Sequence, residues 1–462
     1  MKFHKLTAIL LSLFVVGCND ETNKSTTSIT DSSTSFVDSS LSYEDSSSNN
    51  ETILENKLID VKNNASLDAL NGYEGLTPST GNVNILLIPI HFKDISVSSL
   101  DIDLINKAFN SKDDETVEYY SVSQYYQKSS FNKLNLSFEI TDVYTPSESS
   151  SFYTTAYNNA NYPEAVQSII VEALEYFDNT YDYNNYDSNK DGYIDGIYLV
   201  YDAPVDYKYK YDLWWAWTAF NLDETLKFDN LKFTSYVFAG MDFLKQDNRS
   251  CNTHTLIHET AHMFGIDDYY DYNTSTGTKS GGLASADMMD GTIGDHNAFT
   301  KSLLNWNQGK LVSITNEDEF IVELDAYSKN GDYLILANDF DDTEGILQEY
   351  FILEYYTPTS LNEFDKMFSI NGIRMLHVIA NTKKNGTFKY NNATTNVKLI
   401  SQITTSNGDT YISNTTNRSD DTLFIENEQL DSVKYANGES LQYSFKVISL
   451  SNDKATISIL KK

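Results

Sequence analysis

Residues 83–90, Val-Asn-Ile-Leu-Leu-Ile-Pro-Ile, form an almost unbroken apolar run. Such a run is typical of a strand that is buried on both faces, as in a sheet covered by helices. The segments that follow alternate between helical and strand patterns. Helices are expected around 122–126 and over 163–177, and strands over 134–140 and 197–201. This order predicts an α/β (α+β) domain in which helices cover a twisted sheet.

After Trp306 the pattern changes to short apolar segments separated by turns of Asn, Asp, Gly and Ser. Strands are expected at 320–324, 350–355, 373–379, 397–403, 441–447 and 455–460. Strands at this spacing, without long helices between them, indicate a β-sandwich. We therefore expect one domain at residues 61–308 and a C-terminal all-β sandwich at residues 309–462.

The chain begins with two lysines and an apolar run, residues 6–16, that ends at Gly17-Cys18. The run is shorter than the roughly 20 residues that span a bilayer, so residues 1–17 are predicted to be a signal peptide. The end of the run resembles a bacterial lipobox, in which the cysteine, here Cys18, becomes lipidated. The alternative is an ordinary secretory signal with an incidental cysteine.

Residues 18–60 are expected to be the lipidated Cys18 and a disordered stalk, because they are rich in Ser, Thr and Asn. The protein would then lie on the extracellular face of the bacterial cell membrane, held by a lipid anchor alone. Residues from about 51 to 81 contain scattered apolar positions. They fit either a short pro-segment or an N-terminal arm, and the sequence leaves both open.

The net charge is −33, from 33 basic and 66 acidic residues, and only three of the basic residues are arginines. This balance removes the cationic surface that nucleic acid binding requires. Cys18 and Cys251 are the only cysteines, so an acylated Cys18 would leave no partner for an intrachain disulfide. We expect a monomer that meets the membrane only through its lipid.

Residues 254–268 read His-Thr-Leu-Ile-His-Glu-Thr-Ala-His-Met-Phe-Gly-Ile-Asp-Asp. Histidines four residues apart on a helix project from one face, so His258 and His262 can bind one Zn²⁺. Glu259, next to the first histidine, can reach a water molecule on the metal. His254 extends the same row, but its position at the start of the helix favours a structural role.

Glycine at Gly265 is expected to end this helix and turn the chain back, which brings Asp268 to the metal as third ligand. Asp267 and Glu354 are the alternatives for this position. Three protein ligands leave the fourth position of a tetrahedral zinc ion for water.

The pattern HExxHxxGxxD resembles the zinc signature of the immune inhibitor A family of secreted bacterial metallopeptidases, which belong to the metzincin clan. The similarity extends to residues 83–94, 121–136, 286–291, 295–306, 350–355 and 372–378. The resemblance implies a metzincin-like catalytic domain, a protein or peptide substrate, and a Met-turn at residues 286–291. It favours Met289 over Met288 as the Met-turn methionine. Better-known metzincins have histidine at the position of Asp268.

The implied activity is that of a zinc endopeptidase, in which Glu259 accepts a proton from water as the water attacks a peptide carbonyl. His296 is a candidate for hydrogen bonding to the oxyanion, as is Tyr269. His296 could alternatively be a structural residue at a helix start. Two other functions stay open: a zinc hydrolase acting on glycoproteins, and a calcium-stabilised surface adhesin without enzymatic activity.

Residues 187–195, Asp-Ser-Asn-Lys-Asp-Gly-Tyr-Ile-Asp, match the calcium loop of an EF-hand over its first nine positions. The expected ligands are Asp187, Asn189, Asp191, the backbone carbonyl of Tyr193, and Asp195. Position 12 is Tyr198 rather than the usual glutamate. The alternative is a solvated acidic turn.

Overall fold

The computed structural model describes residues 56–63, 65–159, 164–205, 213–221, 225–245, 250–270, 283, 285–315, 319–380, 398–403, 405 and 420–462. All of them belong to one compact unit, residues 54–462. The predicted signal peptide, the predicted lipidation site Cys18 and the predicted stalk up to residue 55 lie outside the described residues. Within the described part, no helix is long and apolar enough to cross a membrane.

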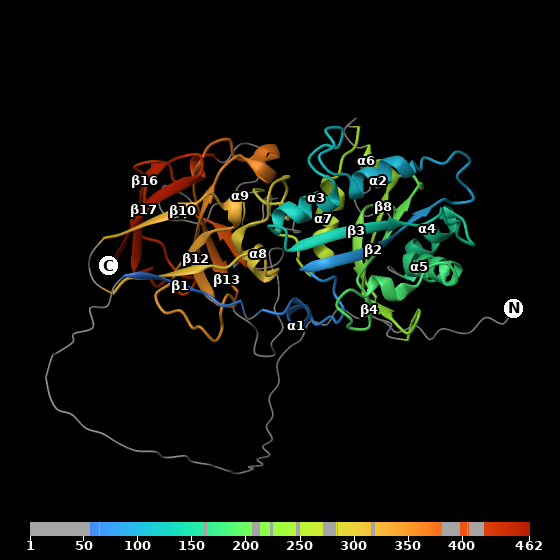
Figure 1. The fold of residues 1–462 in the computed structure, drawn as a ribbon, viewed down its shortest axis with the longest axis horizontal. Coiled ribbons are helices and arrows are strands. Elements are labelled where there is room, and N and C mark those ends of the chain that lie inside the picture. Colours follow the sequence, from blue (N-terminus) through green and yellow to red (C-terminus); the bar gives the residue numbers. More distant parts are fainter. Residues whose placement is uncertain are drawn as a thin grey trace, which may run out of the picture. The chain divides into compact units, whose positions relative to one another are not determined.

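A five-stranded mixed sheet forms the first half of this unit (Figure 1). Its order is β3 (Leu134–Ile140), β2 (Gly81–Ile90), β5 (Ile197–Tyr201), β8 (Ser235–Gly240) and β6 (Trp217–Phe220). Neighbouring strands run parallel from β3 to β8, whereas the edge strand β6 is antiparallel to β8. The predicted strands at 83–90, 134–140 and 197–201 are confirmed.

Helices cover both faces of this sheet. Successive side chains of β2 point to opposite faces, and on each face they pack into a separate hydrophobic cluster with the helices there. Ile85 and Leu87 pack with α2 (Ile102–Asn110), α3 (Val122–Ser129) and α7 (His254–Met263). Leu86 and Ile88 pack on the other side with α4 (Ser150–Asn159) and α5 (Glu164–Phe177). The predicted α/β layers are therefore present, and the helices expected near 122–126 and 163–177 are confirmed.

The second half of the unit contains two further sheets. One has the order β1 (Lys57–Asp60), β9 (Lys310–Ser313), β11 (Tyr333–Leu336), β12 (Glu349–Tyr356), β13 (Gly372–Ile379) and β14 (Ile400–Gln402). The other has the order β10 (Phe320–Asp325), β17 (Lys454–Lys461), β16 (Tyr443–Leu450) and β15 (Gln429–Leu430). Both sheets contribute to one hydrophobic cluster. Each of the six predicted strands coincides with a strand, although β14 is shorter than the predicted 397–403.

Shorter elements connect these sheets. They are α1 (Leu67–Asn71), η1 (Tyr183–Tyr186), β4 (Tyr193–Ile194), β7 (Lys232–Phe233), α6 (Met241–Leu244), α8 (Ala298–Leu303), α9 (Tyr327–Asn330), η4 (Ser360–Phe364) and η5 (Asp420–Thr422). Strands β4 and β7 form a separate parallel pair.

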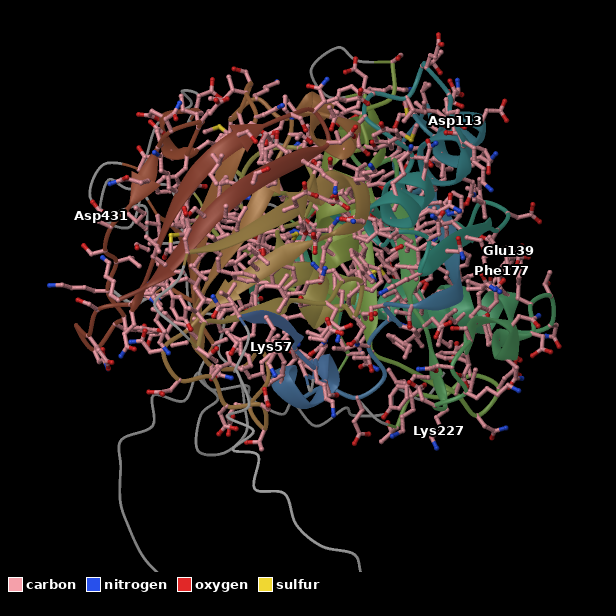
Figure 2. All side chains as sticks on the ribbon, turned by 60° about the vertical axis from the view of Figure 1, so that its left-hand side comes forward. Lys57, Asp113, Glu139, Phe177, Lys227 and Asp431 are labelled. Atoms are coloured by element: carbon pink, nitrogen blue, oxygen red, sulfur yellow. The ribbon has the colours of Figure 1, made fainter. Side chains whose placement is uncertain are left out.

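The prediction of a stalk that extends to Asp60 is wrong for its last four residues. Lys57–Asp60 forms β1, which pairs antiparallel with β9 (Lys57 is labelled in Figure 2). Leu58 packs against the hydrophobic cluster of the C-terminal sheets. The strand could not be recognised from composition, because Lys57–Asp60 contains only two adjacent apolar residues. Its main interaction is backbone pairing with the edge of the sheet at β9. One C-terminal sheet thus includes a strand from before residue 61.

Candidate metal centre

Helix α7 presents His258 and His262 on one side while its opposite side packs into the core. Leu256, Ile257 and Ala261 are fully buried against the five-stranded sheet and its covering helices. The two imidazole rings lie 5.0 Å apart with an interplanar angle of 88°. Their side chains are 17% and 15% exposed, so both rings are largely shielded from solvent but not sealed off from it.

A Schellman motif ends this helix. Gly265 adopts φ +87°, its N–H donates to His262 O at 2.9 Å, and Ile266 N–H donates to Ala261 O at 3.4 Å. The left-handed conformation favours glycine, because a side chain there would strain the backbone. The reversal brings Asp268 back over the histidines, with Oδ1 at 2.9 Å from His258 Nε2 and 3.4 Å from His262 Nε2.

These three side chains fit a zinc ion by chemistry and by spacing. Zinc bonds of about 2.0–2.1 Å at tetrahedral angles place neighbouring ligand atoms roughly 3.3 Å apart. The two distances from Asp268 Oδ1, 2.9 and 3.4 Å, lie on either side of this value. No other group of three His, Cys, Asp or Glu side chains among the described residues is placed to share a metal ion. The structure thus brings the predicted ligands together, with Asp268 rather than Asp267 or Glu354.

Backbone carbonyls fix the orientation of both rings. His258 Nδ1 lies 3.0 Å from Met288 O, and His262 Nδ1 lies 2.6 Å from Ile266 O. Each Nδ1 therefore donates its proton to a carbonyl, and each Nε2 points toward Asp268. Such outer partners are typical of histidines that bind metals.

The charges of Asp268 and the two histidines shift one another's pKa. Burial opposes the protonation of His262, but the carboxylate of Asp268 outweighs it and raises the pKa of His262 to about 10. The pKa of His258 is raised for the same reason. Burial would raise the pKa of Asp268, yet the two imidazoles hold it well below its usual range. The carboxylate is therefore ionised, and the imidazole protons that it stabilises are the ones that a metal ion would displace.

Glu259 is buried beside these ligands, with 9% of its surface exposed. Thr218 Oγ1 lies 2.9 Å from Glu259 Oε2 and 2.7 Å from Glu259 O, so its one hydroxyl proton is shared between the carboxylate and the backbone carbonyl of Glu259. Thr218 belongs to the edge strand β6, a role that the sequence analysis missed. A four-residue strand beside a cluster of tryptophans gives too little alternation to be recognised.

The loop at residues 286–291 contacts both the helix that carries His258 and the segment that carries Asp268. Met288 O accepts from His258 Nδ1, and Met289 O accepts from Tyr269 N–H at 2.8 Å, one residue after Asp268. The side chains of Met288 and Met289 are both fully buried. The loop thus packs against the centre, and its assignment as a Met-turn stays a prediction, as does the preference for Met289.

The structure argues against the two predicted oxyanion donors. His296 is fully buried beside the rings of Tyr125, Tyr126 and Trp306, where burial lowers its pKa to about 3 and keeps it neutral. Tyr269 is also buried, and its hydroxyl lies 2.6 Å from Thr300 Oγ1. Neither side chain reaches a surface that a substrate could contact.

Tyr270, which the sequence analysis did not consider, is half-buried, and its ring stacks near His258 at 6.3 Å. It is therefore better placed than Tyr269 to meet a bound molecule. Its position directly after the Asp-Asp-Tyr segment is the signal that could have identified it.

Glu354, the alternative third ligand, is engaged elsewhere. Its Oε1 accepts from Arg374 Nη1 at 3.2 Å, and its Oε2 accepts from Ala298 N–H at 3.1 Å. Arg374 Nη2 donates to Ala286 O at 2.8 Å, at the start of the 286–291 loop. This buried ion pair, the Glu354–Arg374 clamp, therefore ties β12 and β13 to both ends of the segment between residues 286 and 298.

The predicted calcium loop closes on itself as a turn. Asp187 accepts from the N–H groups of Asp191 and Gly192, and Asp191 accepts from Tyr193 N–H. Asp195 is 2% exposed and accepts from Ser188 N–H at 2.9 Å. Its burial, together with the charges of Asp187 and Asp191, raises its pKa to about 7. The expected ligands thus share one turn, and its hydrogen bonds hold that turn without a cation.

Comparison of the sequence with models of protein families finds no match, and comparison with curated proteins finds no similar sequence. The resemblance to the immune inhibitor A family therefore stays a prediction from the motifs. The case for a function rests on the geometry of the centre.

Replacing Arg374 with alanine should strand the buried carboxylate of Glu354 without its cation. The side chains of this pair are only 4% and 1% exposed, so we expect the free energy of unfolding to fall by about 3–5 kcal/mol. Urea unfolding of the full chain measures this change. The matched control is Lys454→Ala, whose ion pair with Glu323 is exposed and should matter little. Equal losses in the two variants would contradict the assigned importance of the clamp.

Proposed function

We propose that the protein is a zinc-dependent endopeptidase that hydrolyses peptide bonds in proteins or peptides. The observation that carries this proposal is the position of Glu259, a buried carboxylate that accepts from the Thr218 hydroxyl and lies close enough to His258 and His262 for its charge to raise the pKa of both. Binding a metal requires the ligands alone, whereas hydrolysis also requires a base. An adhesin without enzymatic activity would gain nothing from this arrangement.

His258, His262 and Asp268 would hold the ion. A bound zinc ion supplies a Lewis acid that polarises the scissile carbonyl and lowers the pKa of water from about 15.7 toward 7. Glu259 accepts the proton of the attacking water and then delivers it to the leaving amine. Because Oε2 accepts from Thr218, we assign proton transfer to Oε1. The carbonyls of Met288 and Ile266 keep the two imidazoles from rotating during this step.

An extended polypeptide is the substrate that the surroundings favour. Strand β6 is the last strand of its sheet and carries Thr218, so its outer edge runs past the catalytic carboxylate. A peptide can pair with such an edge through main-chain hydrogen bonds. Trp217 and Phe220 of this strand are half-buried and could contact its side chains. This geometry supports a peptidase over a hydrolase directed at the glycan of a glycoprotein.

The remaining features of the proposal concern the whole chain. We infer a metzincin-like catalytic domain, followed by a C-terminal β-sandwich whose two sheets share one hydrophobic cluster. Lipidation of Cys18 would anchor a monomeric enzyme to the extracellular face of the membrane, as the lipobox-like end of the signal peptide suggests. For the 187–195 loop, where Gly192 adopts φ +89° at the sharp turn, calcium stays a proposal from the spacing of the oxygen ligands, and its three carboxylates would have to move together to share the ion.

The substitution Glu259→Gln should remove hydrolysis and leave zinc binding intact, because the amide keeps the shape but cannot accept the proton. We expect the rate of casein cleavage to fall by about 10²–10⁴-fold, with unchanged zinc content by elemental analysis. Glu323→Gln, on an exposed strand, is the control and should cleave normally. A zinc-loaded wild-type chain that digests no polypeptide would overturn the proposal.

Replacing Thr218 with valine removes the hydroxyl that holds the base. A hydrogen bond to a charged group contributes about 1.5–3 kcal/mol, so kcat should fall by roughly 10–100-fold with little change in KM. Thr343→Val removes a similar bond, from a hydroxyl to Asp341 at 2.6 Å, in an exposed turn and should leave kcat unchanged. Steady-state kinetics on one fluorogenic peptide compares the variants. An unaltered kcat in Thr218→Val would rule out this role.

The calcium loop is tested by titrating zinc-loaded protein with Ca²⁺ in a calorimeter. We expect binding that weakens strongly in Asp187→Asn, because this carboxylate supplies position 1 of the loop. Asp178→Asn, at an exposed position just before the loop, is the control. Heat changes that are the same in all three proteins would show that the acidic turn does not bind calcium.

A further inference from the structure

The segment at residues 57–80, which we call the strap, joins distant parts of the described unit. At its start β1 pairs with β9, and Val61 N–H donates to Gly309 O at 2.9 Å. At its end Ser79 O accepts from the indole N–H of Trp306 at 2.6 Å. The sequence alone left open whether this segment is a removable pro-segment or a fixed arm.

Between these ends the strap contacts the turn that terminates the metal-binding helix. Asn71 Nδ2 donates to Gly265 O at 3.0 Å, and Thr77 N–H donates to Met263 O at 3.1 Å. A Cβ atom at Gly265 would lie 2.6 Å from Asn71 Nδ2 and 2.8 Å from Leu76 Cδ1. The strap is therefore in direct contact with Gly265, and no other residue type would fit there without displacing it.

The contact between the strap and Gly265 is linked to two of the ligands, His262 and Asp268, by a few residues of backbone. Gly265 precedes Ile266, whose carbonyl accepts from His262 Nδ1 at 2.6 Å. Asp268 follows two residues later, with Oδ1 at 3.4 Å from His262 Nε2. A shift of the Gly265 carbonyl would therefore move both the partner of one ligand and the backbone that carries another.

The strap also supports the edge strand that holds the base. Tyr73 stacks on Phe220 of β6 with a ring separation of 4.5 Å and an interplanar angle of 12°. Thr234 Oγ1, next to β8, donates to Glu74 O at 2.6 Å. One short segment thus contacts both elements from which the centre is built.

We propose that the strap is a permanent part of the metal centre and that Asn71 is a positioning residue for His262 and Asp268. It is not a pro-segment whose release would activate the enzyme. No described strap residue belongs to the three-ligand group, as a residue that blocks the metal would. The proposal rests on the proposed zinc centre, but it concerns metal affinity rather than the reaction.

The test is the zinc affinity of the full chain carrying Asn71→Asp. This change keeps the shape of the side chain, removes the amide donor and opposes the Gly265 carbonyl with a carboxylate. We expect zinc to bind about 10–100-fold more weakly, as for other residues that orient metal ligands. Zinc alone is the probe, in competition with a chromophoric chelator. Asn71→Leu, which adds no charge, should weaken binding as well.

Asn63→Asp is the matched control, because Asn63 also lies in the strap and its amide donates to Ser302 O and to Asn305 Oδ1. It should destabilise the chain in urea without lowering zinc affinity. If Asn71→Asp does not fold, Leu76→Ala makes the same comparison through lost packing on Gly265.

The outcomes separate the two proposals. Equal zinc affinity in the wild type and the Asn71 variants would overturn the role of the strap and leave the peptidase proposal standing. Faster peptide hydrolysis by Asn71→Asp would likewise overturn it and indicate an inhibitory pro-segment. A wild-type chain that binds no zinc would overturn both.

Discussion

The structure depends on a buried carboxylate, Asp268, that lies within hydrogen-bonding reach of two imidazoles on one helix. Removing a charge from water is costly unless opposite charges and hydrogen bonds compensate for it. The two histidines provide this compensation, but only while their Nε2 atoms stay turned toward the carboxylate. The carbonyls of Met288 and Ile266 hold them in that orientation. The geometry of the centre therefore depends on the positions of the two backbone segments that carry those carbonyls.

Both segments are fixed by parts of the chain that are distant in sequence. The turn at Gly265 is held by Asn71, 194 residues earlier. The loop that begins at Ala286 is held by Arg374, 88 residues later. The helix and its turn place the ligands on one side, and these long-range contacts hold the two backbone segments that orient the imidazoles. The centre therefore requires contacts from distant parts of the described unit and not only the helix that carries the two histidines.

The ligands could be predicted from the sequence because their relation is local. The spacing of His258 and His262 fixes one face of a helix, and Gly265 marks the reversal that leads to Asp268. Thr218 and Asn71 could not be found in this way, since they meet the centre only after the sheet and the strap have formed. The burial of His296 could not be predicted either, because the rings that enclose it, those of Tyr125, Tyr126 and Trp306, come from other elements.

Charge explains how the chain distributes its few buried cations. With a net charge of −33 and three arginines, it places Lys301 and Arg374 in the interior, where they bind Asp295 and Glu354. These pairs fix the segment between the 286–291 loop and α8, and the charge on Asp268 is met by imidazoles instead. Unlike a guanidinium or an ammonium group, an imidazole can give up its proton and bind a metal ion through the freed nitrogen. Permanent cations thus stabilise the frame, and titratable groups surround the point where the proposed zinc ion would bind.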